Sequence, residues 1–280
     1  MAKDIQTTRV GAATVAVVDV YGIPTNIEKL IQAPVGERSE AEAALFAQTV
    51  SLPVNCIVIQ LAGQTVLVDA GEYDAAYDSS SEANRQPPPN LLARLAEIGV
   101  QPADIDHVVI THLHGDHFNA TTTLGATGYQ PTFPNARYYV GRADLEQPGM
   151  REALGKPESL ESRTLGVLDR AGLLVPVEGD RELGPGIEII ASPGETPGHQ
   201  SVRLRSEGET LYCIGDLYHH EIEVVHPTWM VRWADRDSII ASRQGLVEAA
   251  LTENARLVAT HLAGVGRLQR TGSGVEWVTA

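Results

Sequence analysis

The sequence contains little cysteine, only Cys56 and Cys213 in 280 residues. Two thiols far apart in the chain cannot form a disulfide framework or a cysteine-rich metal site, so we expect both to be buried free thiols. No apolar run approaches the ~18 residues that a membrane-spanning helix needs, and the N-terminus lacks the apolar core of a signal peptide. These absences predict a cytoplasmic protein with no membrane partner.

Excess positive charge is also absent, because 36 Asp and Glu residues outnumber 21 Lys and Arg residues and leave a net charge of −15. So acidic a chain is a poor partner for phosphate backbones, and we expect no nucleic-acid partner. The length and the 43% hydrophobic content are typical of a globular chain that buries a large core. Since no change in composition indicates a linker, we expect a single domain over residues 1–280.

What the sequence does contain is nine histidines, three of them in the segment His112-Leu113-His114-Gly115-Asp116-His117. This segment follows an apolar run, residues 105–111, that we interpret as a strand, and a loop at the end of a strand can direct several side chains to one point. Imidazole and carboxylate groups are the ligands that Zn²⁺ and similar ions prefer. Four candidate ligands in six residues favour two metal ions over one.

Three further candidate ligands lie where predicted strands begin or end. His199 follows the turn Thr196-Pro197-Gly198, Asp216 follows the strand at residues 211–215, and His261 follows the strand at residues 257–260. Each of the three is equally consistent with a solvated histidine or a helix cap when taken alone. His219, His220 and His226 are ambiguous on the same grounds.

In their order along the chain, these motifs resemble the metallo-β-lactamase superfamily: Val68-Asp69-Ala70-Gly71, Thr111–His117, Thr196-Pro197-Gly198-His199, Gly215-Asp216 and Thr260-His261. The resemblance covers most of the chain. It implies an α/β fold, the αβ/βα four-layer sandwich, with a dinuclear metal site at one edge. It also implies that His112, His114 and His199 bind the first ion, that Asp116, His117 and His261 bind the second, and that Asp216 bridges them. Asp69 would support the ligand loops without binding metal.

The chemistry that this resemblance implies is hydrolysis without a serine or cysteine nucleophile. Two ions ~3.5–4 Å apart can share a hydroxide at neutral pH, because metal binding lowers the pKa of water. Asp116 would be catalytic if it moves a proton while it binds metal. Zn²⁺ suits these ligands, and Fe, Mn and Co suit them nearly as well.

Within the superfamily, residues 215–220 and 226–229 are similar to the lactonase and organophosphate-hydrolase branch. This similarity implies a lactone or related ester as the small-molecule substrate, with phosphotriesters or aryl esters as the alternative, and a homodimer. Lactonases carry a substrate-holding tyrosine three residues after the bridging aspartate, whereas Tyr218 lies two residues after Asp216. We therefore predict catalytic roles for both Tyr218 and His219. A metal-binding protein without turnover and an iron redox protein are further alternatives.

The predicted substrate contacts come from residues near these motifs. Two of the three tryptophans lie in the segment 229–233, which we interpret as a pocket wall or lid. The loop Glu72–Asn90 is a second candidate for a lid. Core packing is the competing explanation for every aromatic or Met residue considered. The predicted contacts are Phe118, Tyr218, His220, Trp229 and Trp233, and weaker candidates are Tyr73, Met150 and Met230.

Overall fold

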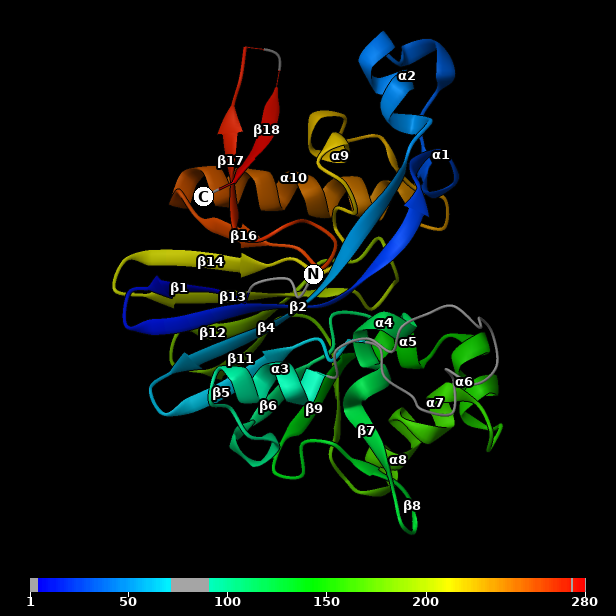
Figure 1. The fold of residues 1–280 in the computed structure, drawn as a ribbon, viewed down its shortest axis with the longest axis vertical. Coiled ribbons are helices and arrows are strands. Elements are labelled where there is room, and N and C mark those ends of the chain that lie inside the picture. Colours follow the sequence, from blue (N-terminus) through cyan, green and yellow to red (C-terminus); the bar gives the residue numbers. More distant parts are fainter. Residues whose placement is uncertain (1–4, 72–90, 273, 280) are drawn as a thin grey trace.

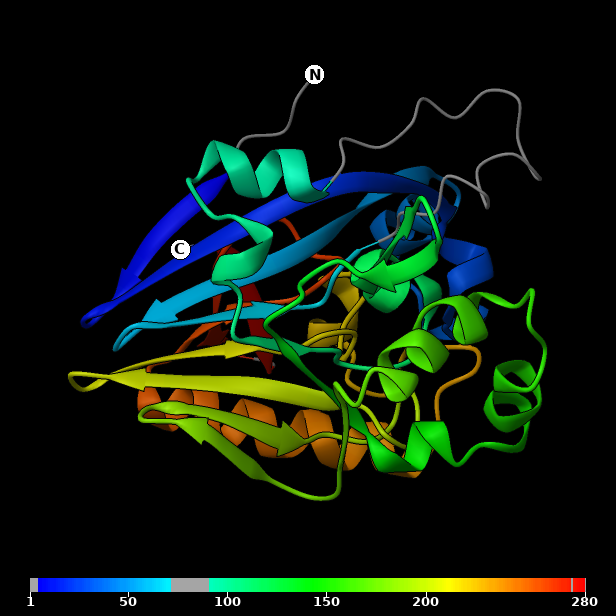
Figure 2. The same ribbon diagram turned by 90° about the horizontal axis from the view of Figure 1, so that it is seen from below.

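The computed structural model describes residues 5–71, 91–272 and 274–279. Two seven-stranded sheets lie face to face with helices on their outer faces (Figures 1 and 2). The first sheet has the order β1 (Gln6–Val10), β2 (Ala13–Asn26), β4 (Thr49–Leu61), β5 (Gln64–Val68), β6 (His107–Val109), β9 (Arg137–Gly141) and β10 (Leu174–Val177). The second has the order β11 (Arg181–Gly184), β12 (Ile187–Ala191), β13 (Gln200–Ser206), β14 (Glu209–Cys213), β16 (Arg256–Val258), β17 (Gly266–Arg270) and β18 (Val275–Thr279). The predicted α/β sandwich is confirmed.

Helices cover the outer faces of the two sheets, and Figure 2 shows α3 over the first sheet and α10 against the second. The helices of the described residues are α1 (Ile27–Leu30), α2 (Glu40–Phe46), α3 (Leu91–Glu97), α4 (Gly115–Phe118), α5 (Arg142–Leu145), α6 (Pro148–Leu154), α7 (Leu160–Arg163), α8 (Leu165–Arg170), α9 (Ile222–Val225) and α10 (Arg236–Glu253). Short 3₁₀ turns are η1 (Val35–Glu37), η2 (Pro102–Asp104) and η3 (Asn119–Thr121). Among the residues placed in the structure, no helix is long and apolar enough to span a membrane.

Strands in the middle of the sandwich are apolar on both faces because both faces are covered. In β5, Val66 and Val68 face the core between the sheets, whereas Leu67 faces the core under α3. The period of two along a strand sends alternate side chains to these two cores, so a central strand is a continuous apolar run. Cys56 and Cys213 are buried in such strands as free thiols, as predicted.

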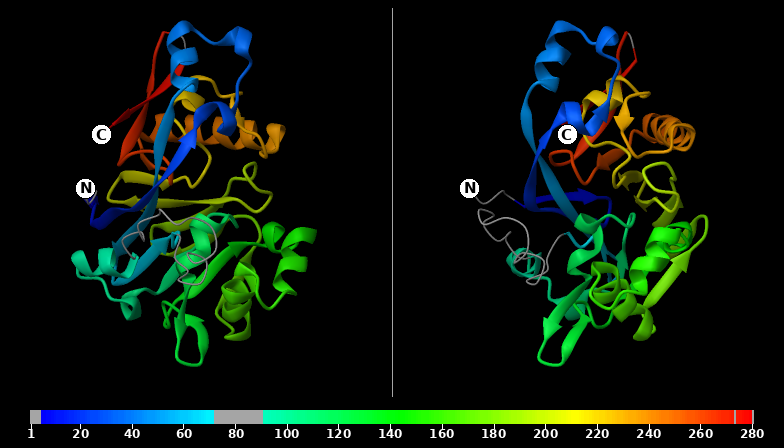
Figure 3. Two further views of the ribbon diagram at one scale, coloured as in Figure 1. Left: turned by 45° about the vertical axis from the view of Figure 1, so that its right-hand side comes forward. Right: turned by 90° about the vertical axis from the view of Figure 1, so that its right-hand side faces the viewer.

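The two longest strands, β2 and β4, stay paired as far as Asn26 and Thr49 and carry α1 and α2 beyond the sheet (Figure 3). There β3 (Ile31–Gln32) pairs with β15 (Met230–Val231), and Trp229 packs against Phe46 in a small core. The hairpin β7 (Thr122–Gly125) and β8 (Gly128–Pro131) projects from the opposite end of the molecule. The part of the chain from α1 to α2, residues 27–46, is called the N-terminal extension here, and it is attached directly to the segment that follows α9.

Strand direction decides where the functional side chains gather. Strands β5 and β6 are parallel, and so are β14 and β16. The carboxyl ends of parallel strands lie at the same edge of a sheet. These four ends lead to Asp69, His112, Asp216 and His261. The strand predicted at residues 105–111 is shorter than expected, because the chain leaves the sheet after Val109 and turns toward this edge.

Candidate metal centre

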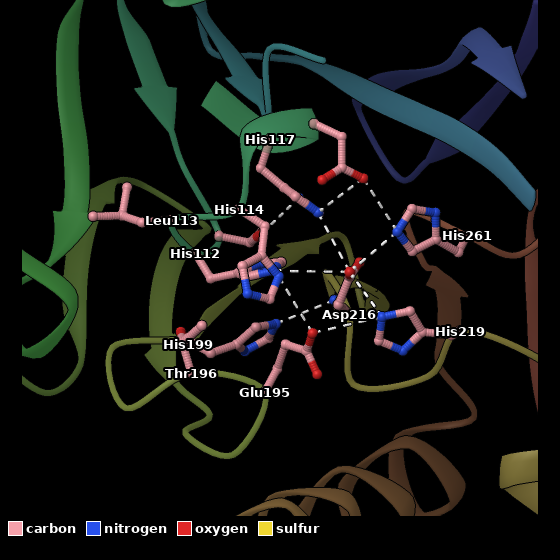
Figure 4. A network of polar contacts seen from close by, with 12 residues as sticks. His112, Leu113, His114, His117, Glu195, Thr196, His199, Asp216, His219 and His261 are labelled. Carbon is pink, nitrogen blue, oxygen red and sulfur yellow. Dashed lines mark hydrogen bonds and ion pairs between the residues drawn. The ribbon is translucent and has the colours of Figure 1, made fainter. Parts of the chain in front are cut away.

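Asp216 is the centre of a cluster of histidines at this edge (Figure 4). Its Oδ2 atom lies 3.1 Å from Nε2 of both His219 and His261. The same oxygen is 3.4 Å from Nε2 of His117 and 3.8 Å from Nε2 of His112. One buried carboxylate oxygen thus faces four imidazole nitrogens that come from both sheets.

On one side of Asp216 lie Asp116, His117 and His261, whose ligand atoms are all within 4.8 Å of one another. Helix α4, a single turn, presents Asp116 and His117 together, and Asp116 Oδ2 lies 3.4 Å from Nε2 of His261. The same oxygen lies 3.7 Å from Nε2 of His117. This is the trio predicted to hold the second ion.

On the other side, a second group has ligand atoms that all lie within 4.8 Å of one another: His112, His114, Glu195 and Asp216. Nε2 of His112 and Nδ1 of His114 are 2.8 Å apart, and Glu195 Oε1 is 3.4 Å from Nδ1 of His114. Three members of the ligand set predicted for the first ion are therefore together. Glu195, which the sequence prediction did not include, is the fourth member.

His199 lies beside this group but not within it. The centre of its ring is 5.3 Å from the ring centre of His112. Its Nδ1 atom donates to the backbone oxygen of Ser192 at 2.9 Å, and its Nε2 atom accepts from the backbone N–H of Asp216 at 3.1 Å. Burial lowers the pKa of His199 to about 4, so the ring is neutral and Nε2 carries a lone pair. A ligand role for His199 stays a prediction.

Among the described residues, several buried polar atoms of the cluster have no hydrogen-bond partner. Their chemistry indicates whether a metal ion fits between them. His117 Nε2, Asp216 Oδ1 and Glu195 Oε2 are buried and make no hydrogen bond within the described residues. Unpaired buried polar atoms are rare in proteins and call for a physical explanation. Imidazole nitrogens and carboxylate oxygens share one natural partner, a divalent cation. The residues present therefore fit a metal centre.

The charges in the cluster are consistent with cation binding. Burial tends to lower the pKa of His261, but Asp216 and Asp116 outweigh it and raise that pKa to about 10. Burial tends to raise the pKa of Asp116, but His117 and His261 hold it at about 2. The carboxylates are thus ionised, and without a metal the protons on these histidines balance their charge. A metal ion would replace those protons.

Two buried aspartates outside the cluster hold the ligand loops in place. Asp69 has a left-handed backbone (φ +60°) and accepts from Nδ1 of His117 at 2.8 Å and from the backbone N–H of Thr111 at 2.7 Å. These contacts are what the predicted supporting role of Asp69 requires, and that role stays a prediction. Asp144 was not predicted: it accepts from the backbone N–H groups of Leu113 (3.2 Å) and Gly198 (2.6 Å). It therefore ties the His112–His114 loop to the loop that precedes His199.

Asp144→Ala is expected to destabilise the protein by roughly 2–4 kcal/mol, because two buried N–H groups lose their acceptor. Urea unfolding of the metal-free protein measures this change in the free energy of unfolding. Asp169→Ala, at an exposed position of α8, is the matched control and should change stability little. Equal effects of the two substitutions would show that Asp144 does not hold the loops.

Of the predicted substrate contacts, the structure brings only Trp233 to the centre. Its indole N–H donates to Glu195 Oε1. The centre of its ring lies 6.0 Å from that of His114 and 6.1 Å from that of His219, and the residue is 51% exposed. His219 also lies in the centre, whereas His220 is half-buried and uses Nδ1 to accept from the N–H of Ile222. The loop Glu72–Asn90, with Tyr73, lies outside the described residues.

Tyr218, Phe118 and Trp229 lie buried in hydrophobic cores, and substrate contacts at these residues stay predictions. Tyr218 is buried beneath the Arg243 guanidinium, Phe118 packs under the first sheet, and Trp229 stacks on His226 and meets Phe46 edge-on. Met230 lies in the core beside α10, and Met150 packs against the core of the first sheet. Aromatic and Met residues near a motif cannot be assigned to a pocket or a core from spacing alone.

The missed residue Glu195 had a weak signal in the sequence. It lies four residues before His199 in the turn-rich segment between β12 and β13. A charged residue in such a segment is ordinarily exposed, yet Glu195 is 2% exposed, and burial raises its pKa to about 7. Only the tertiary structure distinguishes it from a surface glutamate.

A sandwich of two sheets with a His and Asp cluster at one edge defines a class of metal-dependent hydrolases. Residues 50–261 match the profile of the Metallo-beta-lactamase superfamily, and the chain belongs to this family. An N-acyl homoserine lactonase from Bacillus cereus is 26% identical over 204 residues, 67% of this chain and 74% of that relative. An N-acyl homoserine lactonase AttM from Azorhizobium caulinodans is 30% identical over 185 residues, 61% of this chain and 63% of that relative.

Solved structures share the fold over the whole chain. AidC, described as a dizinc quorum-quenching lactonase in complex with a product, aligns with a TM-score of 0.78 at 19% identity and covers 100% of this chain and 98% of its own. The hydrolase AbOPH aligns with a TM-score of 0.80 at 19% identity, with coverage of 99% and 97%. The predicted family, and with it the class of metal-dependent hydrolase, is confirmed.

Proposed function

We propose that this protein is a dinuclear metallohydrolase that opens lactones, with N-acyl homoserine lactones as the first substrate class to test. The observation that carries the proposal is the single oxygen of Asp216 that faces four imidazole nitrogens, with a further group of ligands on each side. The N-acyl homoserine lactonases among the relatives support the substrate class. The proposed ligands are His112, His114 and His199 for one ion, Asp116, His117 and His261 for the other, and Asp216 between them.

Two bound divalent ions would supply a shared hydroxide at neutral pH and polarise the carbonyl of the substrate. Zn²⁺ is the first candidate, and Fe, Mn and Co suit the same ligands. The substrate would approach from the side of His114, whose side chain is 37% exposed, and of Trp233. Trp233 would then form one wall of the substrate site. Asp116, with a side chain 18% exposed, would hold or return a proton at Oδ2.

His219 takes the position at which the lactonases of this branch carry tyrosine, three residues after Asp216. Burial tends to lower the pKa of His219, but Asp216 and Glu195 outweigh it and raise that pKa. A protonated His219 would donate from Nε2 to the oxygen that becomes negative when the ring opens. We therefore propose that His219, rather than Tyr218, assists the leaving oxygen.

Metal removal tests the proposal. We expect the purified protein to hold about two equivalents of metal, measured by mass spectrometry, and to lose its activity after a chelator removes them. Zn²⁺, Mn²⁺ or Co²⁺ should restore it, because the ions supply the nucleophile. On a panel of acyl-homoserine lactones, simple lactones, aryl esters, a phosphotriester and a β-lactam, we expect the highest kcat/KM for lactones.

Other outcomes would redirect the assignment in defined ways. A phosphotriester or aryl ester as the best substrate would move the protein to the organophosphate-hydrolase alternative with the same centre. Two bound ions without hydrolysis of any ester would indicate a metal-binding protein, and iron with oxygen consumption would indicate a redox enzyme. Less than one equivalent of metal, with no activity restored, would contradict the proposal.

A further inference from the structure

Glu195 lies inside the metal centre although it is not part of the motif that predicted the ligands. Its Oε1 is 3.4 Å from Nδ1 of His114 and 3.6 Å from Nε2 of His219. The indole N–H of Trp233 donates to the same oxygen. The other oxygen, Oε2, is buried and has no hydrogen-bond partner among the described residues. The side chain is therefore held at one oxygen and unsatisfied at the other.

Among the described residues, no lysine or arginine forms an ion pair with this carboxylate. Its described contacts are the imidazoles of His114 and His219 and the indole of Trp233, and its ligand atom is within 4.8 Å of the Asp216 carboxylate. Two buried carboxylates this close repel each other and lose their hydration, which is unfavourable unless a cation lies between them. The grouping of His112, His114, Glu195 and Asp216 supplies the donor types that bind such a cation.

We propose that Glu195 is a direct protein ligand of the ion held by His112 and His114. This inference rests on the proposed dinuclear centre and adds a ligand to it. Oε1, the oxygen that faces the ring nitrogens of His114 and His219 (Figure 4), would be the ligand atom, and the indole N–H of Trp233 would hold it in place. Because a carboxylate is a harder ligand than imidazole and carries a negative charge, it would strengthen binding of ions such as Mn²⁺ and Co²⁺ at this position. Trp233 would thereby link the wall of the substrate site to the metal.

The test compares metal binding in Glu195→Gln, which keeps the size of the side chain and removes its charge, with the wild type. We expect Glu195→Gln to bind one ion as the wild type does and the other at least ~10-fold more weakly, in competition with a chelator of known affinity. We also expect the visible absorption of the Co²⁺-loaded protein to change, because the ligands of one ion change.

Two controls separate this role from others. Glu178→Gln removes one charge at an exposed position (side chain 86% exposed) and should leave both affinities unchanged. The melting temperature of metal-free Glu195→Gln should equal or exceed that of the metal-free wild type, because a buried negative charge is removed; a clear loss would indicate a structural role instead. Unchanged affinities and an unchanged Co²⁺ spectrum would overturn the inference while the wild type still bound two ions and opened lactones. A wild type that bound no metal would overturn the proposed function as well.

Discussion

Asp216→Asn is expected to release at least one of the two ions and to lower kcat/KM for the best lactone by at least about 100-fold. Losing an outer hydrogen-bond partner of a metal ligand alone costs ~10–100-fold in affinity or activity, and in the proposed centre Asp216 binds both ions. Its Oδ2 faces His112, His117, His219 and His261 at 3.1–3.8 Å. Asparagine keeps the shape of the side chain, so the effect reports the loss of charge.

The prediction is tested by the metal content of Asp216→Asn and by its initial rates at saturating and limiting substrate. Asp237→Asn is the matched control, because it makes the same chemical change at an exposed position in the first turn of α10. It should keep both ions and the full rate. Full metal content and full rate in Asp216→Asn would show that the two ions are not bridged there and that the dinuclear assignment is wrong.

Arg243→Met is expected to destabilise the protein by about 3–5 kcal/mol, because it leaves a buried carboxylate without its charged partner. Arg243 is 1% exposed, and its Nη2 atom donates to Glu223 Oε1 at 2.7 Å. It also donates to the backbone oxygens of Leu217 and Trp229 at 2.7 and 2.6 Å. The guanidinium thus joins α10 to both ends of the segment that carries His219.

The same pair controls the position of His219. The second oxygen of Glu223 accepts from the backbone N–H groups of His219 at 2.6 Å and His220 at 3.1 Å. We therefore expect Arg243→Met also to lower kcat for lactones, in line with the proposed role of His219. Glu223→Gln should perturb less, because the Arg243 guanidinium that it leaves behind still donates to the backbone oxygens of Leu217 and Trp229.

Urea unfolding of the two single variants and of the double variant forms the cycle that measures this coupling. The double variant should lose less stability than the sum of the two single variants, because the charges are removed together. Lys156→Met, which breaks the exposed pair of Lys156 with Glu152, is the control and should cost under about 1 kcal/mol. A loss this small in Arg243→Met would contradict the prediction.

The sequence predicted the strands and the main motifs well, because both depend on local pattern. The hairpin of residues 54–61 and 65–68 follows from two β-rich apolar runs around Gly63, and it forms β4 and β5. The apolar residues within 238–251 recur at helical spacing, which predicts a helix, and α10 forms there. Asp235 caps it by accepting from the N–H of Ser238. These elements need only neighbouring residues to be recognised.

The substrate contacts could not be predicted in the same way. Tyr218 and Trp229 lie near Asp216 in sequence, but Arg243 of α10 covers Tyr218, and Ile27 and Phe46 of the distant N-terminal extension cover Trp229. Trp233, only four residues after Trp229, reaches the centre because it lies beyond β15 and meets Glu195. Which aromatic residue is covered depends on segments up to 200 residues away, and a local pattern does not contain that information.

By itself, the sequence determined the family, since the order of the His and Asp motifs is a property of the chain, and the two-sheet architecture followed from the resemblance to that family. It also determined which residue types could bind metal. Only the tertiary structure decided that Glu195 lies beside the candidate ligands and that Tyr218 is buried beneath Arg243. It also decided that Glu223 and Arg243 hold the segment of His219. The physical reason is that burial and charge pairing depend on how distant segments pack, and the same glutamate is a solvated surface group or a buried ligand according to that packing.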